Sequence, residues 1–76
     1  MTKFDKQKII GKTIKDKRRK MKLTQLEVAE KTDLSRNYIS DIENGRYMPS
    51  VNTLIKLVDF LGMDLNFLTS LTEIQV

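Results

Sequence analysis

The stretch TQLEVAEKTDLSRNYISDIENG, residues 24–45, predicts two short helices joined by a tight turn. Thr24 and Glu27 have the spacing of a capping box, in which each side chain accepts a hydrogen bond from the other residue's backbone at a helix start. Ser35 is a favourable N-cap for the next helix, and Gly45 is a favourable residue for ending it. Only three residues remain to turn the chain, so we expect the two helices to cross steeply.

The second of these helices is polar along one whole side. Ile39 and Ile42 are its inward anchors, and the polar residues recur at i, i+1, i+4, i+5 and i+8, which places them together on the opposite face. This face comprises Arg36, Asn37, Ser40, Asp41 and Asn44. A small residue, Ala29, lies on the inner face of the preceding helix, where close contact leaves little room. The pattern predicts a helix-turn-helix over about residues 24–44, and an ordinary helical hairpin is the alternative.

The remaining sequence also predicts helices, so the expected fold is all-α, with five helices in a single domain spanning residues 1–76. The expected segments are a first helix over about 6–21, the pair within 24–44, a fourth from Ser50 to Gly62, a fifth from Asp64 to about Leu71, and an unassigned tail, 72–76. Apolar spacing predicts the inner faces of the two long helices. The predicted inner residues are Ile10, Ile14 and Met21 in the first, and Val51, Leu54, Ile55, Leu57, Val58 and Leu61 in the fourth.

Composition narrows the class of protein. The 76 residues suffice for one small domain, and 39% apolar with 32% charged residues suits a globular chain. Cysteine and histidine are both absent, which removes disulfides, most zinc sites and the usual general base, so we expect neither an enzyme nor a metal or cofactor site. We also expect a cytoplasmic protein without a membrane partner, because we find neither an apolar run long enough to span a bilayer nor an export signal.

Positive charge is concentrated at the N-terminus. Residues 1–23 contain ten of the 14 lysines and arginines against two acidic residues, a net charge of +8, whereas the remaining residues carry −4. A basic flank of this kind suggests a polyanionic partner such as nucleic acid. The alternative is a solvated lysine-rich helix.

These features together resemble the helix-turn-helix domain of the phage repressor and Cro family of bacterial regulators, also called XRE-like. The resemblance covers nearly the whole chain and rests on Thr24-Gln25, Ala29, the apolar Ile39 and Ile42, Glu43-Asn44-Gly45, and Pro49 before a leucine-rich helix. It implies a compact, lambda-repressor-like domain of five helices that binds double-stranded DNA. Lys22 and Asp33 stand where the family commonly has glycine, so both are expected in a left-handed conformation.

The resemblance implies that the helix following Ser35 lies in the major groove and contacts base edges. Arg36 suits guanine and Asn37 suits adenine, while Asp41 could accept from a cytosine amine or orient Arg36. Ser40 is short and is expected to be a secondary base contact.

Other residues are expected at the DNA backbone, where contacts position the protein without reading sequence. Gln25 matches the family's backbone-clamping glutamine. The further phosphate candidates are Ser35, which we assign to capping first, Tyr38, Asn44, Arg46, Arg19, Lys20 and Lys22. Arg18 matches a family arginine that pairs with the residue here numbered Glu43, so we expect this ion pair to join the first helix to the third.

The leading hypothesis is a transcriptional regulator, specifically a repressor that binds an inverted repeat as a homodimer. The alternatives are a controller protein of a restriction-modification system, and an antitoxin-type module of the same fold with a regulatory protein partner. A dimer needs an apolar surface away from the DNA-reading helix. The candidates for the dimer interface are Phe67, Leu68, Leu71 and Ile74, and the candidate surface for a protein partner comprises Phe67, Leu68, Leu71, Ile74 and Val76.

Overall fold

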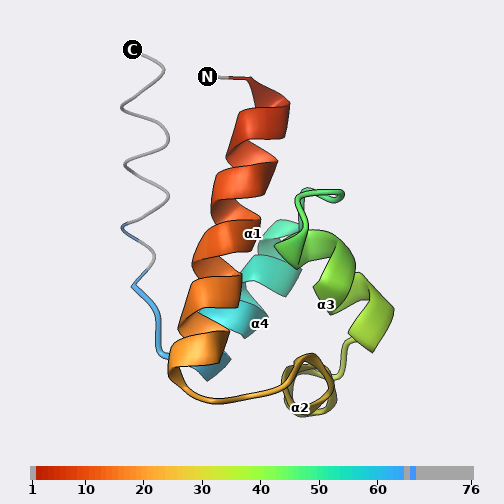
Figure 1. The fold of residues 1–76 in the computed structure, drawn as a ribbon, viewed down its shortest axis with the longest axis vertical. Coiled ribbons are helices and arrows are strands. Elements are labelled where there is room, and N and C mark those ends of the chain that lie inside the picture. The colour runs from red at the N-terminus through yellow and green to blue at the C-terminus, as the bar shows by residue number, and fades with distance from the viewer. Residues whose placement is uncertain (1, 65, 67–76) are drawn as a thin grey trace.

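Four helices make up the described part of the chain. The computed structural model describes residues 2–64 and 66, and these residues form α1 (Lys3–Lys20), α2 (Gln25–Thr32), α3 (Arg36–Glu43) and α4 (Val51–Leu61). In Figure 1, α3 lies beside α1, and α2 lies below α3. The fourth helix, α4, passes behind α1 and α3. The prediction of an all-α helix-turn-helix domain is confirmed. The predicted fifth helix, the tail 72–76 and the candidate dimer residues Phe67, Leu68, Leu71 and Ile74 fall wholly or almost wholly outside the described residues.

The N-caps expected from the sequence are present. The backbone N–H of Glu27 donates to the Thr24 hydroxyl, and the N–H of Thr24 donates to the Glu27 carboxylate. That second bond lowers the pKa of Glu27 below its ordinary value. Ser35 and Ser50 likewise accept from backbone N–H groups at the starts of α3 and α4. Short helices are marginal on their own, and each satisfied cap stabilises its helix by about 1 kcal/mol.

Both expected left-handed residues adopt that conformation. Lys22 has φ of 59°, and Asp33 has φ of 57° where α2 ends and the chain turns toward α3. Such a backbone costs a non-glycine residue on the order of 1 kcal/mol, and aspartate tolerates it better than most. The two sharp turns on either side of α2 are therefore made without glycine.

The first helix differs from its prediction at both ends. It begins at Lys3, before the expected start near residue 6, because Thr2 and Asp5 form a capping box. Met21 was expected in the core, but it is the C-cap of α1 and is 41% exposed. The helix ends at Lys20, so Met21 no longer follows the helical periodicity that placed it inward.

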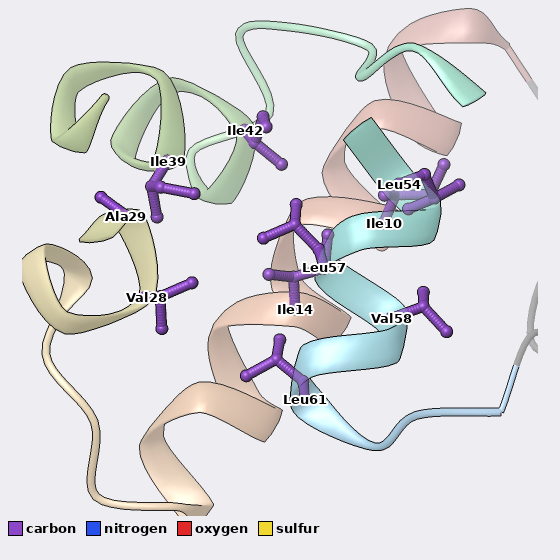
Figure 2. Close-up of a cluster of buried hydrophobic side chains, with 10 residues drawn as sticks. All are labelled: Ile10, Ile14, Val28, Ala29, Ile39, Ile42, Leu54, Leu57, Val58 and Leu61. Carbon is purple, nitrogen blue, oxygen red and sulfur yellow. The ribbon is translucent and has the colours of Figure 1, made fainter. Parts of the chain in front are cut away.

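Ten buried apolar side chains from all four helices form the core shown in Figure 2: Ile10, Ile14, Val28, Ala29, Ile39, Ile42, Leu54, Leu57, Val58 and Leu61. Two residues of α4 that were predicted to face inward, Val51 and Ile55, are exposed, so the prediction for these two was wrong. Val51 is 73% exposed and Ile55 is 49% exposed, because the core covers a narrower stripe of α4 than its apolar residues occupy. No helix in the described ranges is long and apolar enough to cross a bilayer.

A glycine sets the distance between α1 and α3. Gly11 is buried, and a Cβ at this position would overlap the backbone carbonyl oxygen of Ile42 and press against that of Glu43. Neither obstacle is a flexible side chain, so the two helix backbones can approach this closely only because Gly11 has no side chain. Four residues earlier on α1, the buried Gln7 donates from Nε2 to the carbonyl oxygen of Gly45, just beyond α3.

Gly11→Ala is expected to lower the free energy of unfolding by about 1 to 3 kcal/mol, the usual cost of overpacking. Helix propensity alone predicts the opposite sign, since alanine is favoured over glycine within a helix by about 1 kcal/mol. Thermal unfolding followed by circular dichroism tests this, with the exposed Glu30→Ala on α2 as the control. A Gly11→Ala protein that melts at or above the parent temperature would show that α1 and α3 can separate without cost.

Candidate nucleic-acid interface

The polar face of α3 is directed away from the core by its two anchors. Ile39 and Ile42 are 1% and 0% exposed, and they fix the rotation of the helix about its own axis. Arg36 and Asn37, at the start of α3, are exposed, and no side-chain hydrogen bond engages either within residues 2–64 and 66. Both side chains therefore retain their full set of donors, which is what base-edge contacts require.

Asp41 pairs with a residue other than the one considered from the sequence. Its Oδ1 accepts from Nη1 of Arg46 at 3.2 Å, and its carbonyl oxygen accepts from the Arg46 backbone N–H at 2.9 Å. The structure thus shows Asp41 bonded to the segment after α3 and not to Arg36. Asp41 is expected to contact a base and Arg46 a phosphate, and in the free protein these two residues form an ion pair with each other.

Ser40 and Asn44 are also bonded to each other. Nδ2 of Asn44 donates to the Ser40 carbonyl oxygen at 2.8 Å and lies 3.3 Å from the Ser40 hydroxyl. Tyr38 is partly buried and packs against the core, and its ring meets that of Tyr47 edge to face at a centroid distance of 6.0 Å. Ser35 accepts from the Tyr38 N–H as an N-cap. The C-terminal half of the polar face is therefore internally hydrogen-bonded, in contrast to Arg36 and Asn37.

A buried carboxylate joins α3 to the two helices that precede it. Arg18 on α1 donates from Nε and Nη2 to the two oxygens of Glu43, at 2.7 and 2.9 Å, and from Nη1 to the carbonyl oxygen of Leu23 at 2.8 Å. The side chains of Arg18 and Glu43 are 11% and 1% exposed. This geometry is a bidentate pair, the strongest form of charge-assisted hydrogen bond between such groups.

Gln25 is a third member of this network, which the sequence did not reveal. Its Nε2 donates to Oε1 of Glu43 at 3.1 Å. A surface hollow of about 560 Å³ opens beside it, lined by Arg18, Leu23, Thr24, Gln25, Leu26 and Arg36. Gln25, which is expected to contact the DNA backbone, and Arg36, which is expected to contact a base, thus border the same hollow.

The basic residues expected near phosphate lie where α1 leads into α2. Arg19 and Lys20 end α1, Lys22 occupies the turn, and all three are exposed. Among the described residues, no cluster of three or more acidic side chains is placed to hold a metal ion. The geometry is therefore that of a surface offering hydrogen-bond donors and positive charge, centred on α3 and the start of α2.

Comparison with known proteins agrees with this geometry. The family model described as helix-turn-helix matches residues 14–68, which include α2, α3 and α4. A control-region protein of 10 kDa from Bacillus phage phi105 (ImmF) is 51% identical over 69 residues, covering 91% of this chain and 76% of the relative.

Two further relatives are longer than the segment they share with this chain. The immunity repressor protein of the same phage is 46% identical over 57 residues, which are 75% of this chain and 40% of the repressor. The transcriptional regulator ImmR of Bacillus subtilis is 32% identical over 66 residues, which are 87% of this chain and 52% of the relative. The match to these two regulators thus covers about half of their length or less.

Glu43→Gln is expected to lower the free energy of unfolding by about 3 kcal/mol, because Arg18 then stays almost fully buried without its counter-charge. For a domain of this size, 1 kcal/mol corresponds to roughly 4 to 8 °C in melting temperature. The control is Asp16→Asn, which breaks the exposed pair with Lys12 and should leave the melting temperature nearly unchanged. Equal melting temperatures for the two variants would contradict a stabilising role for the buried pair.

Proposed function

This chain belongs to the phage repressor and Cro-type helix-turn-helix family of DNA-binding transcriptional regulators, and we propose that it is a sequence-specific repressor. The observation that carries the proposal is the polar face of α3. Among the residues that the structure describes, no hydrogen bond engages the side chains of its two N-terminal residues, Arg36 and Asn37, while Ile39 and Ile42 hold the opposite side of the helix in the core. A helix presented in this way can enter the major groove of B-DNA.

Base reading is assigned mainly to the start of α3. Arg36 can donate two hydrogen bonds to guanine O6 and N7, and Asn37 can form the corresponding pair with adenine N6 and N7. Ser40 and Asp41 contribute as secondary base contacts. In the free protein the Ser40 hydroxyl accepts from Asn44 and Oδ1 of Asp41 accepts from Arg46, which leaves the Ser40 O–H donor and the second Asp41 oxygen available to DNA.

Phosphate contact is assigned to both flanks of α3. On the α2 side, Gln25 borders the surface hollow, and the exposed Arg19, Lys20 and Lys22 add positive charge. On the other side, the candidates are Tyr38, Asn44 and Arg46, while the hydroxyl of Ser35 is already used as the N-cap. Contacts to two backbone strands that flank a groove would fix the orientation of the helix between them.

Repression is favoured over activation by the relatives, because one of them is itself an immunity repressor of a phage. A repressor needs no catalytic site and acts by occupying DNA that overlaps a promoter. The structural requirement is therefore affinity and specificity for double-stranded DNA, which the α3 surface supplies.

A homodimer on an inverted repeat is the proposed working form. One copy of α3 offers four residues to the bases, enough for about 4 or 5 base pairs, which cannot single out a site in a bacterial genome. Two copies related by a two-fold axis would read half-sites about 34 Å apart. The sequence offers Phe67, Leu68, Leu71 and Ile74 as the apolar interface.

Arg36→Ala is expected to weaken binding to the specific site by about 1 to 3 kcal/mol and binding to random DNA much less, since a bidentate base contact discriminates between sequences. Gln25→Ala should instead weaken binding to all sequences by similar factors. The site is first selected from a random duplex library, and affinities are then measured by fluorescence anisotropy at two salt concentrations. Equal losses for Arg36→Ala on both DNAs would contradict base reading, and no selected sequence at all would contradict the proposed function.

Replacing Leu71 and Ile74 together with aspartate is expected to give folded monomers that bind DNA weakly and without dependence on half-site spacing. Two buried charges would oppose association of the apolar surfaces. Analytical ultracentrifugation measures the oligomeric state, and the exposed Val51→Asp on α4 serves as the control for an added surface charge. A tight dimer in the double variant would place the interface elsewhere, and a wild-type monomer bound to a single half-site would refute the symmetric arrangement.

A further inference from the structure

Three N–H donors from two different helices meet at the carboxylate of Glu43. Arg18 on α1 supplies two of them, and Gln25, the first residue of α2, supplies the third through Nε2 at 3.1 Å. The Glu43 side chain is 1% exposed, so water does not replace these donors. Arg18 already neutralises the carboxylate, which makes the bond from Gln25 an additional contact whose role the ion pair does not explain.

The chemistry of the two groups determines how the Gln25 amide is oriented. An ionised carboxylate only accepts hydrogen bonds, whereas a glutamine amide has an accepting oxygen at one end and two N–H donors at the other. With Glu43 facing it, the amide must turn its nitrogen inward, because the opposite orientation would set oxygen against oxygen. One of the two Nε2 hydrogens is used in this bond, and the second remains available.

We propose that Glu43 is a positioning residue for the DNA-backbone contact of Gln25. The carboxylate holds the amide nitrogen in place, and the second Nε2 hydrogen then donates to a phosphate oxygen at the bordering hollow. Phosphate, like carboxylate, only accepts hydrogen bonds, so one amide group bridges an anion inside the protein and an anion on the DNA. The inference rests on the proposed function, in which Gln25 contacts the DNA backbone.

This arrangement links backbone contact to base reading. Glu43 is the last residue of α3, the helix that carries Arg36 and Asn37. Phosphate contacts set the register of the protein on the duplex. The bond between Glu43 and Gln25 therefore fixes the distance between the phosphate contact of Gln25 and the base contacts of α3.

Electrostatics and positioning predict opposite effects for the loss of this carboxylate. Glu43→Gln removes a negative charge, so the change in net charge alone would strengthen binding to a polyanion. A substituted amide can present either oxygen or nitrogen to Gln25, so it no longer selects one orientation of that side chain. Positioning therefore predicts weaker binding to DNA, and the sign of the change distinguishes the two effects.

The test is a double-mutant cycle on random duplex DNA. Affinities of the wild type, Gln25→Ala, Glu43→Gln and the double variant are measured by fluorescence anisotropy, at a temperature where circular dichroism shows each protein folded. Glu43→Gln is expected to weaken binding by about threefold or more in the wild-type background and by less than about twofold in the Gln25→Ala background. The control is Glu27→Gln on α2, which removes the same charge from an exposed carboxylate that does not bond to Gln25 and should bind as tightly as the wild type or more so.

Two kinds of result would overturn the inference, and they bear on different parts of it. If Glu43→Gln weakens binding equally in both backgrounds, or does not weaken it, Glu43 does not act through Gln25 while the phosphate contact itself stands. If Gln25→Ala binds random DNA as tightly as the wild type, the phosphate role assigned to Gln25 in the proposed function fails first, and the inference fails with it.

A measurement on the unmodified chain covers the case in which Glu43→Gln does not fold. The two Nε2 protons of Gln25 give separate NMR signals. In the free protein, one is expected to exchange slowly with solvent because it is bonded to Glu43, and the other to become protected only when random duplex DNA is added. Equally fast exchange of both protons in the free protein would contradict the inferred orientation.

Discussion

The bidentate ion pair between Arg18 and Glu43 is the contact on which the arrangement of the three N-terminal helices depends. Hydrophobic burial is not directional, so the apolar core of this small domain could accept α3 at more than one rotation or shift. A buried carboxylate is costly unless its partners are in place, and here they come from α1 and α2 together. The observed placement of α3 satisfies both partners of Glu43 and turns its polar face outward.

Close backbone contact makes this placement possible. Gly11 lets the backbone of α1 reach the carbonyl groups of Ile42 and Glu43, and Gln7 bonds to the carbonyl oxygen of Gly45 beyond the end of α3. An eight-residue helix is not stable by itself in water, so α3 takes its shape and direction from the helix it rests on. In this fold α1 is therefore a support for α3, the helix proposed to read DNA, as well as a carrier of positive charge.

Local signals predicted the elements well, because caps and turns act within a few residues. The capping box at Thr24 and the N-cap at Ser35 follow from neighbours close in sequence, whereas the left-handed Asp33 was expected because the family commonly has glycine there. Tertiary contacts gave no such local signal, and the pair between Arg18 and Glu43 was expected only from the family resemblance. The closeness of α1 to α3 at Gly11, and the bond from Gln25 to Glu43, join residues 18 or more positions apart, and periodicity also overestimated the buried stripe of α4 by including Val51.

The internal bonds of the α3 surface determine where specificity can arise. Ser40, Asp41 and Asn44 already bond within the protein, which restricts the orientations in which their remaining donors and acceptors can meet DNA. Arg36 and Asn37 make no side-chain hydrogen bond within the described part of the chain, and they lie in the first turn of α3, which Ser35 caps. Discrimination between sequences should therefore be concentrated at the N-terminal turn of α3, while its C-terminal turn anchors the helix to α1 and α2 through Glu43.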